Sequence, residues 1–200
     1  MPGLVCDPIE LDALIRRRQE TGADRDDEVW EGLYVMSPLA TPEHQRIAFE
    51  LSAILIEVVT RKKLGIVYGS SNVTDQEFDW THHYRCRDVV MVLKESAHRY
   101  RDIGPTLLGG PDFLIEVRSP EDKTFEKLDF YASIGVRELL VVDRDTKALR
   151  LFRLNAGRLL ERSSTDGWFA SEVVPLRFLT TSDQEVEVCS TEQPPRVWLV

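Results

Sequence analysis

The sequence has few cysteines and no long apolar run. The three cysteines, Cys6, Cys86 and Cys189, are scattered and odd in number, so they fit neither a disulfide framework nor a zinc site. No apolar stretch approaches the roughly 20 residues that a helix needs to cross a bilayer. The first residues have neither the basic start nor the apolar run of a secretory signal. These absences predict a protein of the reducing cytoplasm that has no membrane partner.

Positive charge is also scarce. The chain of 200 residues has 25 Lys and Arg against 34 Asp and Glu, which gives a net charge of −9. Proteins that simply coat nucleic acid are usually basic because phosphate contacts dominate their affinity, so this function is disfavoured. A metal-dependent nuclease is still allowed, since bound cations offset clustered carboxylates and local basic patches can hold a phosphate backbone. The lack of a glycine-rich phosphate loop argues against a ligand-binding α/β domain of that type.

Three segments of the sequence have residues that are typical of helix starts and helix ends. Capping residues or proline mark their starts, and glycine marks their ends. In the second segment, apolar residues also recur at helical spacing. The expected helices run from Asp7 to near Gly22, from Thr41 to near Gly65, and from Glu121 to Ile134.

Short apolar runs between these helices predict strands. The expected strands are Val29–Met36, Ile66–Gly69, Cys86–Leu93, Asp112–Arg118 and Arg137–Val142. Because several are apolar throughout, we expect a sheet that is covered on both faces. A hairpin is expected at residues 149–162, and further strands near residues 169–174 and 185–188. The predicted fold class is therefore α/β (α+β), a mixed sheet flanked by helices with extra antiparallel strands at the C-terminal end.

Two carboxylates stand inside apolar strands. Asp88 lies near the start of a strand otherwise full of valine, and Glu116 lies late in the run Phe113–Val117. A carboxylate in such a place is unfavourable unless it is paired, hydrogen-bonded or bound to a metal. Hard divalent cations such as Mg²⁺ prefer oxygen ligands, so one shared metal explains both residues. The alternatives are a loop-capping role for Asp88 and an ion pair of Glu116 with Arg118 or Lys127.

Basic residues follow Glu116 at spacings that suit phosphodiester chemistry. Strand alternation places Arg118 on the same face as Glu116, in an E-x-K arrangement that has arginine at the lysine position. Arginine keeps its proton firmly, so Arg118 is expected to contact phosphate rather than to accept a proton. Lys127, on the following helix, can extend towards the carboxylates and orient or activate water. The alternative is that Lys127 is an ordinary exposed lysine.

One histidine belongs to the same set of candidates. His44 falls at helical spacing with Leu51 on the second predicted helix. It is either a partly buried residue bonded near the helix start or a residue at the mouth of the site that touches substrate. Trp30, Trp80 and Trp168 are interpreted as packing residues rather than as platforms for base stacking.

A series of short motifs runs through residues 29–154. They are Trp30-Glu31-Gly32, Met36-Ser37-Pro38, His44-Gln45, Arg87-Asp88-Val89-Val90, Gly110-Pro111-Asp112, Ile115-Glu116-Val117, Ser119-Pro120, Lys127 with Tyr131, and Gly135-Val136-Arg137-Glu138-Leu139. In this order they resemble the Uma-two family of restriction endonucleases, which belongs to the PD-(D/E)XK nuclease superfamily. The resemblance implies a restriction-endonuclease-like core in which Asp88 and Glu116 bind metal. It also implies that Lys127 is the motif lysine moved from strand to helix.

Two positions depart from the family pattern. Arg87 replaces the usual proline, a change expected to leave metal binding unaffected. Lys123 occupies a place where many members carry an acidic residue, and Asp122 is one position away.

The resemblance covers residues 29–154, and predicted strands follow it. We therefore expect a single domain over residues 1–200, with a nuclease-like core at 29–154 and a strand-rich extension at 155–200.

Two functions are consistent with these observations. The first is a Mg²⁺- or Mn²⁺-dependent endonuclease that cuts phosphodiesters, with DNA as the expected substrate. Asp88 and Glu116 then bind metal, Lys127 acts on water, and Arg118 and His44 contact substrate. The second is a nuclease-fold protein without catalysis that serves as a binding or assembly module, which the acidic charge and Arg118 favour. The strand-rich C-terminal segment can pair with a second copy, so a homodimer is expected.

Overall fold

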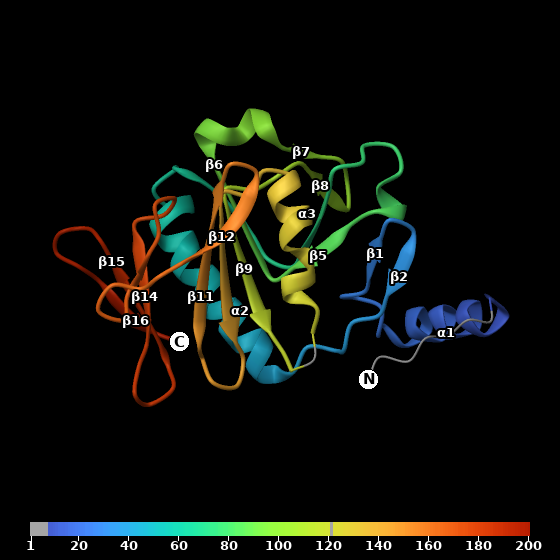
Figure 1. Cartoon of the computed structure of the whole chain (residues 1–200), viewed down its shortest axis with the longest axis horizontal. Coiled ribbons are helices and arrows are strands. Elements are labelled where there is room, and N and C mark those ends of the chain that lie inside the picture. Colours follow the sequence, from blue (N-terminus) through green and yellow to red (C-terminus); the bar gives the residue numbers. More distant parts are fainter. Residues whose placement is uncertain (1–7, 121) are drawn as a thin grey trace.

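The structure is a computed structural model that describes residues 8–120 and 122–200. The predicted helix starts at Asp7 and Glu121, together with Cys6, lie outside these residues. The first described element is the helix α1 (Pro8–Thr21), which Figure 1 shows extending from one side of the molecule. None of the helices in the described ranges is long and apolar enough to cross a membrane.

A six-stranded mixed sheet forms the centre of the fold. Its strands are β3 (Gly65–Tyr68), β6 (Val89–Leu93), β9 (Phe113–Arg118), β10 (Glu138–Asp143), β11 (Leu149–Asn155) and β12 (Arg158–Arg162). They lie in the order β12-β11-β10-β9-β6-β3 (Figure 1), in which only β9 and β10 are parallel neighbours. The predicted fold class, a mixed sheet flanked by helices, is confirmed.

Each face of this sheet is covered by one helix. The helix α2 (Pro42–Leu55), continued by a π-helical turn at Ile56–Thr60, packs against β3, β6 and β9. The short helix α3 (Leu128–Ser133) contributes Tyr131 to the apolar cluster on the opposite face. Successive residues of β6 and β9 alternate between the two clusters, which explains why these strands are apolar throughout.

The third predicted helix is shorter than expected. The side chain of Asp122 accepts hydrogen bonds from the backbone N–H groups of Ser119 and Thr124, at 2.8 and 2.9 Å. An aspartate that bonds to the backbone in this way stabilises a turn in place of helix. Helical structure therefore begins only with a 3₁₀ turn at Thr124–Lys127, before α3.

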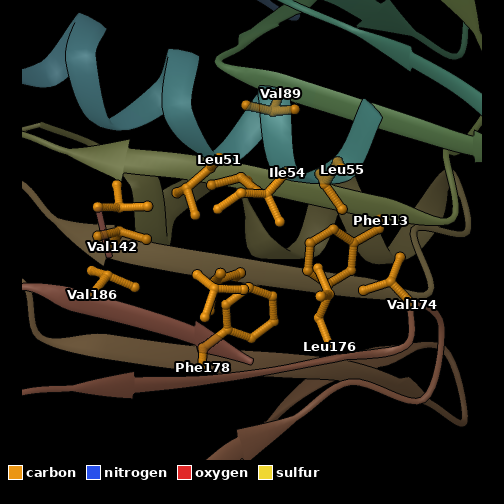
Figure 2. Close-up of a cluster of buried hydrophobic side chains, with 14 of the residues drawn as sticks. Leu51, Ile54, Leu55, Val89, Phe113, Val142, Val174, Leu176, Phe178 and Val186 are labelled. Carbon is orange, nitrogen blue, oxygen red and sulfur yellow. The ribbon is translucent and has the colours of Figure 1, made fainter. Parts of the chain in front are cut away.

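The C-terminal strands pack on the same apolar cluster as α2. They are β13 (Phe169–Ala170), β14 (Leu176–Thr180), β15 (Val186–Ser190) and β16 (Val197–Leu199), in that order in one antiparallel sheet. Figure 2 shows Phe178 of β14 beside Phe113 of β9, and the two rings stack with centroids 6.2 Å apart. Burial of one such side chain contributes about 1.5–3 kcal/mol. The division into a core at 29–154 and an extension at 155–200 stays a prediction.

The strand predicted at Cys86–Leu93 is in fact two strands of different sheets. The first, β5 (Arg85–Arg87), belongs to a second sheet with β4 (Ser71–Thr74), β7 (Arg101–Asp102) and β8 (Thr106–Leu108), in the order β5-β4-β8-β7. The second is β6 in the central sheet. Asp88 is the residue between them, so it lies where the chain passes from one sheet to the other. No strand was predicted at β4, β7 or β8, which are short and partly polar.

The strand predicted at Val29–Met36 is a hairpin of β1 (Glu28–Trp30) and β2 (Leu33–Val35). Its two turn residues, Glu31 and Gly32, have φ values of 51° and 84°. Positive φ at both central residues is typical of the tightest hairpin turns, in which glycine is favoured. A bridge between Val29 and Tyr84 holds the hairpin against the segment that leads into β5.

Glu43 connects the start of α2 to the turn between β10 and β11. Its carboxylate accepts hydrogen bonds from Arg46 at 2.9 Å and from Lys147 at 2.7 Å. These bonds, with Arg46 the stronger cause, lower the pKa of Glu43 to about 2. A lowered folded-state pKa means that the contribution to stability is complete above the ordinary value of 4.5 and is lost as the pH falls through about 2.

We therefore expect Glu43→Gln to remove this part of the acid sensitivity. The effect should stay below about 1 kcal/mol, because the side chains of Glu43 and Arg46 are each 42% exposed and their interaction is screened by solvent. The measurement is the Tm of wild type and of Glu43→Gln between pH 5 and pH 2. The amount by which the wild-type Tm exceeds that of the variant should shrink as the pH falls. A wild-type advantage that stays constant over this range would contradict the assignment.

Candidate functional site

Asp88 and Glu116 lie opposite each other at the end of two paired strands. Val89 of β6 pairs with Ile115 of β9 in an antiparallel register, and one step further along this register Asp88 faces Glu116. Oδ2 of Asp88 also accepts a hydrogen bond of 2.7 Å from the backbone N–H of Val117. The structure thus brings together the two carboxylates that the apolar strands single out.

Both carboxylates line one pocket. The acidic residues that line it are Asp26, Glu28, Asp88, Glu116 and Asp122, and the basic ones are His44 and Lys127. Acidic groups therefore outnumber basic ones around this space. Burial and the negative charge of Asp88 raise the pKa of Asp26, as expected where carboxylates are crowded. Neither Asp26 nor Glu28 was predicted from the sequence to belong to the site. Glu28 is the first residue of β1 and Asp26 lies two positions before it, and both line the pocket.

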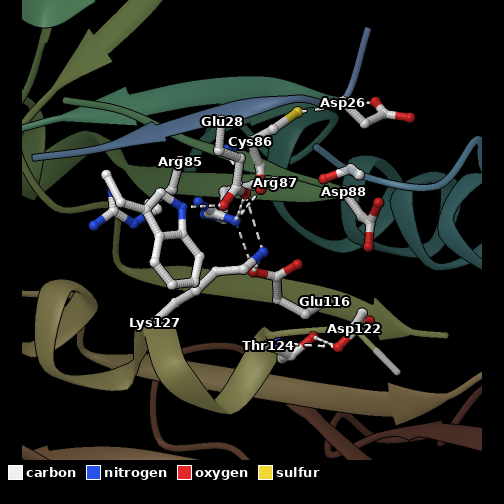
Figure 3. A network of polar contacts seen from close by, with 12 residues as sticks. Asp26, Glu28, Arg85, Cys86, Arg87, Asp88, Glu116, Asp122, Thr124 and Lys127 are labelled. Atoms are coloured by element: carbon white, nitrogen blue, oxygen red, sulfur yellow. Dashed lines mark hydrogen bonds and ion pairs between the residues drawn. The ribbon is translucent and has the colours of Figure 1, made fainter. Parts of the chain in front are cut away.

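Glu116 is held by three donors from different elements. Its Oε1 accepts hydrogen bonds from Arg87 Nη1 at 2.7 Å, Tyr131 Oη at 2.5 Å and Lys127 Nζ at 3.5 Å. Within residues 8–120 and 122–200, no hydrogen bond reaches its other oxygen, Oε2. In Figure 3 that second oxygen points away from Lys127. One oxygen of Glu116 is therefore fixed by the protein and the other is left for the pocket.

Lys127 reaches the carboxylates from the turn before α3, and its side chain is only 11% exposed. Its Nζ donates to Glu28 Oε1 at 3.0 Å as well as to Glu116. Burial opposes its charge, but the negative charges of Glu116 and Glu28 outweigh burial, so the pKa of Lys127 is raised. Lys127 is therefore a protonated cation near neutral pH, and the interpretation of an ordinary exposed lysine was wrong.

Glu28 and Arg87 complete the buried charge network that Figure 3 shows. Arg87 is fully buried, and its Nη1 also lies 3.4 Å from Glu28 Oε1. Oε2 of Glu28 accepts a hydrogen bond of 2.5 Å from the indole N–H of Trp30. Burial raises the pKa of Glu28, but the charges of Lys127 and Arg87 outweigh it and the net shift is downward. Two carboxylates and two cations therefore balance each other beneath the pocket.

His44 lies at the pocket, at the start of α2. The side chain of Thr41 caps this helix by accepting a hydrogen bond from the backbone N–H of His44. The His44 ring places Nε2 2.8 Å from Asp88 Oδ1 and Nδ1 3.4 Å from Ser119 Oγ. Burial lowers the pKa of His44, but the hydrogen bond and charge of Asp88 outweigh burial and raise it overall. His44 is therefore partly buried and hydrogen-bonded near the helix start, and it also lines the pocket, while its predicted contact with substrate stays a prediction.

Arg118 does not line this pocket. Its Nη1 pairs with Asp143 Oδ2 at 3.2 Å, and its guanidinium lies 5.3 Å from the ring centroid of Phe125. Arg118 is the last residue of β9 and stands beside Asp143 in the parallel register with β10, which directs its side chain to that neighbour. Its predicted contact with substrate therefore stays a prediction.

The chemistry of the donors around the pocket suits a hard cation. No group of three or more His, Cys, Asp or Glu side chains that could hold a metal occurs among the described residues. Mg²⁺, however, is often held by one or two carboxylates together with water. Asp88 and Glu116 offer two such ligands where acidic groups are in excess. We therefore take Asp88 and Glu116 as the ligands that fit a cation. A cation bound here would compete with His44 for Oδ1 of Asp88.

Comparisons with known proteins are consistent with this geometry. Residues 16–182 match the sequence profile of Uma2, described as "Putative restriction endonuclease". A similar solved structure is that of a protein from Anabaena variabilis ATCC 29413, described as a putative nuclease belonging to DUF820. The two chains are 17% identical with a TM-score of 0.59, and the match covers 72% of this chain and 80% of that one. At this identity the likeness shows the fold alone. No curated protein matches the chain.

Proposed function

The chain belongs to the Uma2 family, described as "Putative restriction endonuclease", and from this premise we propose that it is a Mg²⁺- or Mn²⁺-dependent endonuclease that hydrolyses phosphodiester bonds in DNA. The observation that carries the proposal is the pair of opposed carboxylates at the end of β6 and β9, with a buried lysine beside one of them. Family membership indicates a nuclease. The metal and the DNA substrate are our inference from the site.

In this proposal Asp88 and Glu116 hold the cation. A bound divalent cation lowers the pKa of water and offsets charge that develops on the phosphate oxygens. Lys127 keeps its proton, so it attracts a phosphate oxygen or orients water and does not accept a proton. His44 lies within hydrogen-bond distance of Asp88 and can donate to a phosphate oxygen at the pocket mouth. Arg87 and Tyr131 keep Oε1 of Glu116 in place, which leaves Oε2 towards the cation.

Titration with Mn²⁺ by calorimetry, in wild type and in Glu116→Gln, tests the site without a guess about the substrate. The amide keeps an acceptor for Arg87 and Tyr131 but removes the charge, so we expect Mn²⁺ affinity to fall at least tenfold. Incubation with supercoiled plasmid, single-stranded DNA and RNA then identifies the substrate. Equal Mn²⁺ affinity in the two proteins would contradict the assignment of Glu116.

A second candidate function is a nuclease-fold protein that binds or assembles without cutting. The observation in its favour is that Arg87 and Lys127 already compensate the charge of Glu116, while Arg118 pairs with Asp143. The same titration separates the two candidates, since an inactive module needs no Mn²⁺ at Glu116. The strand β16, which pairs only with β15 within its sheet, leaves an edge for the predicted homodimer, and that assembly stays a prediction.

A further inference from the structure

A second groove opens beside the pocket and is continuous with it. The groove has a volume of about 630 Å³ and shares five lining residues with the pocket: Glu28, Ser37, Pro38, Asp122 and Lys127. A molecule whose reacting group lies at Asp88 and Glu116 would therefore extend past Lys127 into this groove. The groove is large enough for a nucleotide by comparison with typical ligand sites of roughly 300–1,000 Å³.

The groove differs from the pocket in charge. Asp26, Asp88 and Glu116 line only the pocket, whereas Arg18 and Lys123 line only the groove. Arg18 is already engaged by Asp27 at 2.6 Å. The side chain of Lys123 is 37% exposed, and its one ion pair among the described residues is with the exposed Glu126 at 3.5 Å. Lys123 is thus the cation of the groove that is most available to a phosphate.

One wall of the groove is apolar and aromatic. Trp30 lines it together with Val35, Met36, Pro38 and Pro120. The indole of Trp30 is fixed by its hydrogen bond to Glu28 and by the guanidinium of Arg85, which lies 4.6 Å from the ring centroid. The ammonium of Lys123 lies 5.5 Å from the same ring. A flat ring held in place beside a partly exposed cation is the combination that binds a base and its phosphate in single-stranded nucleic acid.

We propose that this groove binds one unpaired nucleotide next to the phosphodiester that is cut. Its base packs against Trp30 and the apolar wall, and its phosphate pairs with Lys123. This inference rests on the proposed nuclease function and specifies the substrate class as DNA with a single-stranded stretch or an unstacked base. A base inside a duplex is stacked on both faces, so it cannot lie against Trp30. Trp30 is then a substrate-binding residue, beyond the packing role expected from the sequence.

Binding without metal tests the groove separately from cleavage. We would measure the fluorescence anisotropy of labelled (dT)₁₂ and of a blunt 12-base-pair duplex in EDTA, where metal-dependent cutting is absent. We expect (dT)₁₂ to bind at least tenfold more tightly than the duplex. Trp30→Leu should weaken (dT)₁₂ binding about tenfold, within the range that stacking of one base on an aromatic ring supports, and Trp30→Phe should restore most of it.

Lys123→Ala should weaken (dT)₁₂ binding several-fold and reduce the salt dependence of log K by about 0.7, the value for one phosphate contact in a single strand. The matched control is Lys62→Ala. The Lys62 side chain is also 37% exposed and is also paired with a glutamate, but it does not line the groove. We expect it to leave the binding constant within twofold. Unfolding curves confirm that each variant is folded.

The outcomes separate the groove from the nuclease proposal. If the protein cuts DNA in Mn²⁺ but Trp30→Leu and Lys123→Ala bind and cut like wild type, the groove assignment is wrong and the nuclease stands. If the variants lose (dT)₁₂ binding but the wild type cuts nothing, the groove stands and the nuclease proposal is wrong. Equal binding of (dT)₁₂ and duplex, with no effect of either variant, would also overturn the groove.

Discussion

Asp88→Asn is expected to lower cleavage about 1,000-fold with little change in folding. Loss of one carboxylate ligand weakens cation binding and the charge stabilisation that the cation gives, and a 1,000-fold loss corresponds to about 4 kcal/mol in the barrier. The fold should tolerate the change because the side chain is 21% exposed. The amide oxygen can still accept the backbone N–H of Val117. The measurement is the single-turnover rate on a fixed DNA substrate in Mn²⁺.

The matched control is Asp129→Asn, which removes an exposed carboxylate of α3 that does not line the pocket. It should leave the rate within about twofold of wild type. A rate for Asp88→Asn that stays within tenfold of wild type, with Mn²⁺ in excess, would show that Asp88 is not part of the reacting site. Calorimetry on the same preparation reports whether the lost rate follows the lost Mn²⁺ affinity.

Arg87→Ala is expected to destabilise the protein by about 3–5 kcal/mol, the usual result of removing one partner from a buried ion pair. Arg87 is completely buried, and its guanidinium pairs with Glu116 and lies 4.4 Å from the ring centroid of Tyr131. Its removal leaves Lys127 as the remaining cation, among the described residues, that is paired with the carboxylates of both Glu116 and Glu28. Urea unfolding measures the loss as a lower midpoint at an unchanged slope.

A double-mutant cycle identifies the cause. If the loss comes from an unpaired carboxylate, Arg87→Ala should cost less in the Glu116→Gln background than in wild type, because the charge that needs Arg87 is gone. Arg87→Lys serves as the conservative variant and should recover part of the stability. Equal costs in the two backgrounds would mean that Arg87 acts through packing on Tyr131.

The sequence alone was sufficient to predict that the carboxylates of Asp88 and Glu116 lie together and that Lys127 lies beside them. Asp88 and Glu116 stand out because a charge inside an apolar strand needs a partner. Lys127 follows from the helix after Glu116, and the structure places it 3.5 Å from that carboxylate. The catalytic roles of these residues stay predictions. The same rule about charges in apolar strands applies to Arg87, which we interpreted only as a replaced proline, and the structure shows it bonded directly to Glu116.

Other parts of the site could not be read from local pattern. Glu28 is 88 positions before Glu116 in the sequence, and only the packing of the β1–β2 hairpin brings it to Lys127. The break at Asp88 depends on which sheet each half of the run joins, a tertiary property that periodicity does not contain. Alternation correctly places Arg118 on the face of Glu116, but it does not show that Asp143 pairs with it at the strand end.

The position of Glu28 on a separate hairpin has a consequence for the order of folding. The central sheet can bring Asp88, Glu116 and Lys127 together while water still reaches them from the side of the hairpin. Long-range contacts such as that between Glu28 and Lys127 form slowly, because a long loop must close first. Docking of the hairpin then excludes water and adds the carboxylate of Glu28 beside Lys127 at the same moment. Chains caught before this step would have the core of the fold and an unfinished site.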